Sequence, residues 1–196
     1  MSSPQSNTRE RILKETWRLM EERRGHDVRL EDVAKAAGVS RQAVYLHFGS
    51  RTELMIATAR YLDQVLRCDD RLRPVLTSQD GVRSLEAYVE FWGNYIPEIY
   101  GLAKALMAAR ETDEAAAAAW NDRMGALYQG CLQIVRCLQQ QNKLAPEWSI
   151  EEAASFFRAT LAIETWDTLT EERGWSKDQY IERIQRALKR VLVRGA

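Results

Sequence analysis

The 196-residue sequence has little glycine and proline, few β-branched residues and no long apolar segment. Its 10 glycines and 4 prolines make 14 residues, about 7% of the chain against roughly 12% in average proteins. Valine, isoleucine and threonine total 30, whereas the strong helix formers (Ala, Leu, Lys, Arg, Glu, Gln and Met) total 106. Sandwiches, barrels and doubly wound sheets need runs of β-branched residues. The composition therefore predicts an all-α protein.

Signals for membranes, secretion and metals are also missing. No stretch reaches 18 apolar residues, as a transmembrane helix requires, and Met1–Glu10 lacks the apolar core of a secretory signal. The three cysteines, Cys68, Cys131 and Cys137, are an odd number, which is typical of free thiols in a reducing compartment. The last two lie six residues apart and match no zinc-binding spacing. We expect a cytoplasmic protein without metal, cofactor or membrane partner.

Catalytic motifs are equally scarce. The sequence has only two histidines, His26 and His47, and it contains no G-x-S-x-G motif, phosphate-binding loop or cluster of histidine with carboxylates. Carboxylate pairs such as Glu151-Glu152 stand where helices are expected to begin, and there the helix dipole explains them. The sequence therefore predicts a protein that is not an enzyme.

The overall charge of zero conceals an asymmetry along the chain. Residues 1–60 carry 11 Lys and Arg against 8 Asp and Glu, a net charge of +3, whereas residues 61–196 carry 17 against 20, a net charge of −3. A basic end on an acidic body suits a protein that presents that end to a polyanion.

Apolar periodicity and turn residues predict about nine helices in two domains. The N-terminal domain covers residues 6–66 and ends in a linking helix at about 51–67, and the second domain covers residues 67–196. Pro74 is expected to lie in a turn, and Pro97 is expected to open a helix. The expected helices span about 8–23, 30–37, 41–48, 51–67, 82–95, 98–109, 114–142, 150–173 and 177–194.

Residues 30–54, LEDVAKAAGVSRQAVYLHFGSRTEL, have the pattern of a helix-turn-helix. Gly38 stands where the turn requires a left-handed backbone, and Ser40 stands where it caps the second helix. A minimal shared core is available from Val33, Ala37, Val39 and Val44. An ordinary helical hairpin has the same pattern. The pattern alone therefore does not distinguish a hairpin within a bundle from a DNA-binding helix-turn-helix.

The outward residues of the second helix favour DNA binding. Arginine and glutamine read base edges in the major groove, and tyrosine and histidine donate to phosphates. A packed helical bundle does not need these residue types together on one face. The exposed set is Arg41, Gln42, Tyr45, Leu46 and His47.

This region resembles the TetR family of bacterial transcriptional regulators, over roughly residues 6–66. The rest of the chain is similar to that family in length and helical layout. The matching segments are TRERIL at 8–13, Val33-Ala34, Ala37-Gly38-Val39-Ser40, Tyr45, His47-Phe48 and Arg51-Thr52-Glu53-Leu54.

The resemblance implies roles for individual residues. Tyr45 is expected to contact the DNA backbone, and Arg51, where the family usually has lysine, to lie near a phosphate. The family usually has serine or threonine before its first motif helix, where this chain has Val28-Arg29, so Arg29 is expected to gain a phosphate contact instead. The expected partner is a near-palindromic double-stranded operator. The DNA-binding residues predicted are Arg29, Ser40, Arg41, Gln42, Ala43, Tyr45, Leu46, His47, Arg51 and Thr52.

Aromatic residues recur one helical turn apart in residues 67–196, the C-terminal body of the chain. They suit core packing or, as the resemblance implies, a cavity for a flat or lipophilic ligand. Nearby carboxylates (Glu90, Glu98, Glu164 and Asp167) suit a cationic ligand in the second case. The ligand-binding residues predicted are Tyr88, Trp92, Tyr95, Met107, Trp120, Met124, Tyr128 and Trp166.

The last two expected helices are apolar on more than one face, so one face needs a partner. The resemblance implies a homodimer in which two helices from each subunit form the interface, and the alternative is a core within one chain. The interface residues predicted are Phe157, Leu161, Ile184, Leu188 and Val191.

Together these features predict a homodimeric repressor that a small lipophilic or aromatic ligand releases from its operator. Two alternatives remain. One is a DNA-binding regulator without a ligand, and the other is a small-molecule sensor or carrier with a vestigial DNA-binding head. The intact pair Arg41-Gln42 argues against the last.

Overall fold

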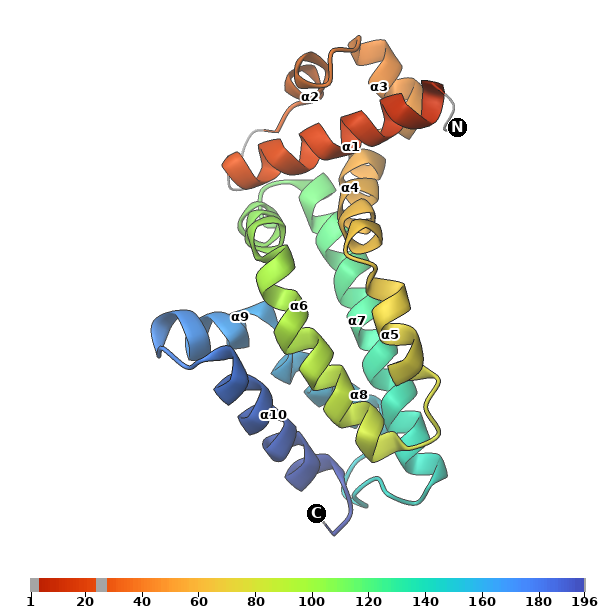
Figure 1. Ribbon diagram of the computed structural model, residues 1–196, viewed down its shortest axis with the longest axis vertical. Helices are drawn as coiled ribbons and strands as arrows, with labels where there is room; N and C mark the ends of the chain where they lie inside the picture. The colour runs from red at the N-terminus through yellow and green to blue at the C-terminus, as the bar shows by residue number, and fades with distance from the viewer. Residues whose placement is uncertain (1–3, 24–27, 196) are drawn as a thin grey trace. The chain divides into compact units, whose positions relative to one another are not determined.

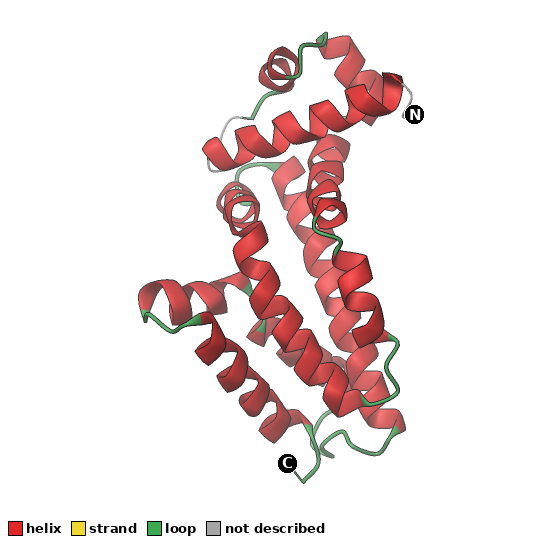
Figure 2. Ribbon diagram, in the orientation of Figure 1, coloured by secondary structure: helices red, strands yellow, loops and turns green. Residues whose placement is uncertain are grey.

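The computed structural model describes residues 4–23 and 28–195 of the chain, which form ten α-helices and one π-helical segment (Figures 1 and 2). Over these residues no strand forms beyond an isolated bridge between Leu144 and Val193, so the all-α prediction is confirmed. No helix in the same ranges combines the length and hydropathy needed to cross a membrane. The elements are α1 (Pro4–Glu22), α2 (Leu30–Ala36), α3 (Arg41–Phe48), α4 (Arg51–Val65), α5 (Cys68–Leu76), α6 (Gly81–Ala109), α7 (Glu114–Gln140), α8 (Ile150–Thr160), α9 (Ile163–Trp166), η1 (Asp167–Glu172) and α10 (Lys177–Leu192).

The chain divides into two compact units. The first unit comprises Met1–Leu66 and Ile99–Met124, and the second comprises Arg67–Glu98 and Gly125–Ala196. Helices α6 and α7 each contribute to both units. The division into two domains that the sequence predicted, at residues 6–66 and 67–196, stays a prediction.

The first unit is built on the amphipathic pattern of its helices. Ile12 and Met20 of α1 are fully buried, and Val33 of α2 and Val44 of α3 are 1% exposed. Each of these residues lies on the apolar stripe of its helix, so burying the stripes together excludes water from one shared core. The turn between α2 and α3 has Gly38 at a φ of 63°, as the sequence predicted.

The second unit packs around large aromatic side chains. Tyr88 and Tyr95 of α6, Phe157 of α8 and Tyr180 of α10 are at most 2% exposed. Helix α10 lies very close to α6 at Gly93, where a β-carbon would stand 2.5 Å from Ile181 Cγ1. Glycine at this position is therefore what permits the close approach of the two helices.

Two of the four prolines lie where the sequence did not predict them. Pro74 lies inside α5 rather than in a turn, and Pro97 lies inside α6, which continues unbroken from Gly81 to Ala109. A proline within a helix removes one backbone hydrogen bond. Around Pro97 that loss is offset by burial, because Tyr95 and Ile96 beside it are at most 1% exposed.

The expected single helix over 150–173 is divided into three pieces. Helix α8 ends at Thr160, Ala162 adopts an extended backbone, and α9 is followed by the π-helical segment η1. The Trp92 indole N–H donates to the Leu161 carbonyl at 2.6 Å, so a side chain replaces a helical backbone donor at this position. This tertiary contact is invisible in local periodicity.

Candidate nucleic-acid interface

Helix α3 is held in place by two buried anchors and a cap. Val44 is 1% exposed and Phe48 is 4% exposed, and both lie on the inner face of the helix. Ser40 caps the helix as predicted, because its Oγ accepts the backbone N–H of Ala43 at 3.1 Å. Arg9 adds a contact from α1, with its Cζ 5.0 Å from the centre of the Phe48 ring. The opposite face of α3 is thereby fixed toward solvent.

That solvent-facing side carries the side chains predicted to meet DNA. Arg41, Gln42, Tyr45 and Leu46 are all exposed, whereas Ala43 and His47 are half-buried. Leu46 is 81% exposed, which is unusual for a large apolar residue on a folded surface. An exposed leucine among arginine, glutamine and tyrosine matches the mixed chemistry of a major groove, where thymine methyl groups alternate with polar base edges.

Arg41 is oriented by neighbours on two helices. Its Nη1 lies 2.7 Å from Oε1 of Glu31 in α2, and its Nη2 donates to the Tyr45 hydroxyl at 3.3 Å. The hydrogen bond with Tyr45 and the negative charge of Glu31 both raise the pKa of Arg41. Glu31 was not singled out from the sequence. Its only signal there is its place in the first turn of a motif helix.

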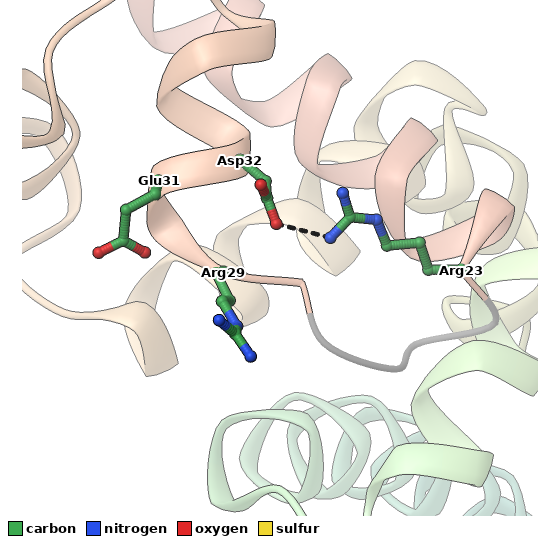
Figure 3. Close-up of a pocket in the computed structure, with 4 residues that line it drawn as sticks. All are labelled: Arg23, Arg29, Glu31 and Asp32. Carbon is green, nitrogen blue, oxygen red and sulfur yellow. Dashed lines mark hydrogen bonds and ion pairs between the residues drawn. The ribbon is translucent and has the colours of Figure 1, made fainter.

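Arg29, predicted to contact a phosphate, is exposed at the start of α2. It occupies the N-cap position without a side-chain cap, as its residue type predicts. It lines a hollow of about 510 Å³ together with Arg23, Glu31 and Asp32 (Figure 3). Within the hollow Arg23 pairs with Asp32 at 2.6 Å, and this hydrogen bond lowers the pKa of Asp32. In Figure 3 the Arg29 side chain points away from this ion pair.

Arg51, the other predicted phosphate contact, has partners within the protein. Its Nη1 and Nη2 each donate to an Asp113 oxygen at 2.6 Å, and its Nε donates to the Val28 carbonyl at 3.0 Å. Three of its five N–H groups are therefore used to join the entry to α2, the start of α4 and the turn before α7. This engagement gives Arg51 a structural role, and its phosphate contact stays a prediction. Thr52, next to it, is half-buried.

Asp113 is held from both sides. Besides Arg51, it accepts the backbone N–H groups of Ala115 and Ala116 at 3.0 and 3.3 Å, as an N-cap of α7 does. The Arg51 hydrogen bonds lower the pKa of Asp113, and the two backbone donors act in the same direction against its partial burial. Sequence reasoning missed Asp113 because its partner lies 62 residues away.

A second ion-pair network also joins α4 to α7 within the first unit. Arg60 Nη2 lies 2.5 Å from Asp122 Oδ1, and Arg123 pairs with both Asp122 and Asp63. The hydrogen bond from Arg60 is the largest cause that lowers the pKa of Asp122. Because the helix that follows the DNA-binding motif is tied to α7 at two places, a shift of α7 within this unit would be passed to α4.

The predicted ligand-binding residues are divided between the two units. Met107, Trp120 and Met124 belong to the first unit, and the other five belong to the second. Met107, Met124 and Tyr128 are half-buried. The remaining five, which are Tyr88, Trp92, Tyr95, Trp120 and Trp166, are at most 8% exposed.

In the second unit these aromatic side chains already have protein partners. The Tyr88 hydroxyl donates to the Leu127 carbonyl at 3.2 Å, and its ring meets Phe157 edge-on at 5.8 Å. The Trp166 ring lies 4.8 Å from that of Tyr180. In the first unit, Arg110 lies 5.1 Å from the Trp120 ring centre. Such contacts suit core packing, so the predicted ligand contacts of these residues remain proposals.

The predicted dimer-interface residues lie mainly inside the subunit. Phe157, Leu161 and Leu188 are fully buried, Ile184 is 7% exposed, and only Val191 is half-buried. The side chains of the first four pack within one chain, and their place in a dimer interface stays a prediction. The large apolar residue of α8 that is exposed is Phe156, at 38%, and its ring lies 5.1 Å from that of Trp148. The sequence predicted apolar residues on more than one face of these helices without showing which face lies outward.

Comparison with known proteins identifies the N-terminal helices. Residues 12–58 match the family model of bacterial regulatory proteins, tetR family. The sequence matches none of the curated proteins. Solved structures are similar over nearly the whole chain, at identities that establish the fold.

Three of these structures illustrate the likeness. A putative transcriptional regulator from Saccharomonospora viridis in complex with choline has 23% identity and a TM-score of 0.73, over 96% of this chain and 99% of that one. Native NalD from Pseudomonas aeruginosa, the secondary repressor of the MexAB-OprM multidrug efflux pump, has 24% identity and a TM-score of 0.72, over 98% and 99%. The transcriptional regulator FadR from Bacillus subtilis, in complex with stearoyl-CoA, has 13% identity and a TM-score of 0.71, over 91% and 96%.

Proposed function

The chain carries the DNA-binding domain of the tetR family of bacterial regulatory proteins, and from that premise we propose that it is a cytoplasmic, ligand-released transcriptional repressor. The exposed face of α3 is the observation that carries DNA binding. It presents Arg41, Gln42, Tyr45 and Leu46 on a helix whose inner face is anchored by Val44 and Phe48. A single short helix with this chemistry enters a major groove and reads base edges there.

A dimer follows from the size of this reading surface. Helix α3 has 8 residues, and one such helix contacts too few base pairs for operator affinity. Two copies about 34 Å apart, or a multiple of that distance, read two half-sites on one face of the duplex and require a near-palindromic sequence. We place the subunit interface on the outward faces of α8 and α10, where Phe156 and Val191 retain exposed surface.

The ligand of this repressor binds in the C-terminal body. Two of the similar structures, one with choline and one with stearoyl-CoA, contain small molecules. In this chain the body is rich in aromatic residues, which suit lipophilic or aromatic compounds. Ligand binding would be passed to the DNA-binding helices through α4, whose Arg60 and Asp63 are tied to α7.

Selection of bound duplexes from a random library, using the full chain, tests the proposal. The expected result is an enriched, near-palindromic site that the Arg41→Ala variant binds at least about tenfold more weakly. Arg136→Ala, an exposed arginine on α7, is the charge-matched control and should bind as the unaltered chain does. Failure to enrich any sequence would leave the sensor with a vestigial head as the better description.

A further inference from the structure

The Arg71 side chain of α5 lies against two aromatic rings and a carboxylate of α6, all within the second unit. Its Cζ is 5.1 Å from the centre of the Phe91 ring and 5.3 Å from that of Tyr95. Its Nη2 and Nη1 donate to the two Glu98 oxygens at 3.0 and 3.2 Å. A cation within about 6 Å of a ring centre is attracted by the π face, so these three groups surround one positive charge.

The aromatic part of this arrangement is rigid. Phe91 and Tyr95 stack with their ring centres 5.0 Å apart and their planes 22° apart, and they are 8% and 1% exposed. The Trp92 ring supports Tyr95 from 5.9 Å. The two charged side chains, in contrast, reach solvent, because those of Arg71 and Glu98 are 33% and 37% exposed. A small molecule can therefore reach the position that Arg71 occupies.

Helix α5, which carries Arg71, lies at the surface of the second unit. None of its residues is buried, it contains Pro74, and no side chain caps its start. It begins after Arg67, which has a left-handed φ of 54°, a conformation disfavoured for arginine. Besides the Arg71 contacts, the Gln133 amide donates to the Leu76 carbonyl at 2.7 Å. A helix without a fully buried residue opens locally at a lower cost in free energy than a core helix does.

We propose that Phe91, Tyr95 and Glu98 form a binding site for a small organic cation of the quaternary ammonium type, and that Arg71 is an internal occupant which this ligand displaces. The chemistry selects that class. Two π faces attract a weakly hydrated cation, and one carboxylate balances a single positive charge. A calcium or magnesium ion would require six or more oxygen ligands, which these residues do not supply. The inference rests on the proposed function only in taking the C-terminal body to be the ligand-binding part.

Because Arg71 must leave the rings first, the apparent affinity of the site for its ligand is lowered. The ligand binds only the fraction of molecules in which Arg71 has left the rings, so its apparent affinity is lowered by that fraction. Binding also removes the ion pair and the ring contacts by which Arg71 joins α5 to α6. Because α5 follows α4 after two residues, Leu66 and Arg67, the released segment adjoins the helix that leaves the DNA-binding motif.

Calorimetric titration of the full chain with choline tests the site. Arg71→Ala should bind choline at least about tenfold more tightly than the unaltered chain, because the competing cation is gone. Arg71→Gln retains part of the stem and should shift the affinity in the same direction. Arg73→Ala, on the same helix and paired only locally with Asp70, is the matched control and should bind as the unaltered chain does.

Two further measurements identify the chemistry. In the Arg71→Ala background, Glu98→Gln should weaken choline binding at least about tenfold, and 3,3-dimethylbutan-1-ol, the neutral isostere of choline, should bind at least about tenfold more weakly than choline. Circular dichroism is used to check that each variant is folded. Equal choline affinity in the unaltered chain, Arg71→Ala and Arg71→Gln, or equal binding of the neutral isostere, would overturn the inference. DNA plays no part in these titrations, so a chain that binds choline as expected but enriches no operator would refute only the proposed function.

Discussion

Arg51 at the start of α4 and Asp113 before α7 form a bidentate ion pair, with both N–O distances at 2.6 Å. The pair connects two further contacts within the first unit. Arg51 also donates to the Val28 carbonyl, and Asp113 also accepts a backbone N–H at the start of α7. A guanidinium held in this way by a carboxylate is oriented more strictly than one that only neutralises charge. The entry to the DNA-binding motif is thus fixed to the same carboxylate that begins α7.

Replacing Arg51 should therefore reduce stability rather than change the salt dependence of DNA binding. Arg51→Met leaves Asp113 partly buried without its cation, which should lower the free energy of unfolding by about 1–3 kcal/mol. The measurement is chemical denaturation, beside the salt dependence of DNA affinity. If Arg51 contacted a phosphate, the slope would fall by about one unit. Such a fall with unchanged stability would contradict the structural role.

The same pair should make stability depend on acid. The folded pKa of Asp113 is lowered below its ordinary 3.8, so its contribution is fully present above about pH 4 and is lost as the pH falls through the lower folded value. Asp113→Asn keeps a capping oxygen but has no charge to titrate. We expect its stability to fall less steeply than that of the unaltered chain between about pH 4 and 2. Parallel acid denaturation curves would show that the ion pair contributes nothing to folding.

Sequence reasoning succeeded where the cause of a structure is local. The left-handed Gly38 and the Ser40 cap both depend on residues within four positions. The exposed face of α3 also follows from helical periodicity. Each of these features was therefore predictable from a short window.

It failed where the cause is a distant contact. The pairing of Arg51 with Asp113 was not predicted, because the two residues are 62 positions apart. The break after α8 depends on Trp92, 69 residues from Leu161. The apolar stripes of α8 predicted burial correctly, but which stripe faces a partner is set by the packing of α8 against α10. None of these contacts produces a periodic pattern in the sequence.

Base recognition should separate from phosphate contact in two variants of α3. Gln42→Ala removes an exposed side chain able to make a bidentate contact with adenine, so it should relax the preference at one or two base pairs by about 1–3 kcal/mol. Tyr45→Phe removes only a hydroxyl and should weaken binding to all duplexes equally. Fluorescence anisotropy against the selected site and its single-base variants distinguishes the two effects. An unchanged base preference in Gln42→Ala would remove that residue from the groove.

The dimer should depend on Phe156 rather than on the residues buried in α8 and α10. Phe156 is 38% exposed, so Phe156→Glu places a charge on the proposed interface without opening the core, and we expect sedimentation to show monomers. Leu188→Asp is unsuitable because Leu188 is fully buried, and the variant would unfold the subunit. The matched control is Gln139→Glu, an exposed residue of α7. A Phe156→Glu chain that remained dimeric would move the interface to another surface.

The final prediction concerns release from the operator. A ligand shifts the equilibrium only if it binds the released conformation more tightly than the DNA-bound one. Changing a 99:1 preference for the operator to 1:99 requires about 5.5 kcal/mol, so two sites in a dimer must each supply somewhat under 3 kcal/mol. Within the first unit the ties from Arg60 and Asp63 to α7 are the means of transmission, and cutting them should reduce that coupling.

We therefore expect an Arg60→Gln/Asp63→Asn chain to bind the operator but to lose most of its response to ligand. Compounds that quench the tryptophan fluorescence of the unaltered chain are titrated against operator complexes of both proteins. In the double variant the ligand affinity should persist while the change in operator affinity shrinks by about tenfold or more. An undiminished response in the double variant would place the transmission path elsewhere, and a ligand that binds tightly to the unaltered chain without changing its operator affinity would favour a regulator that acts without a ligand.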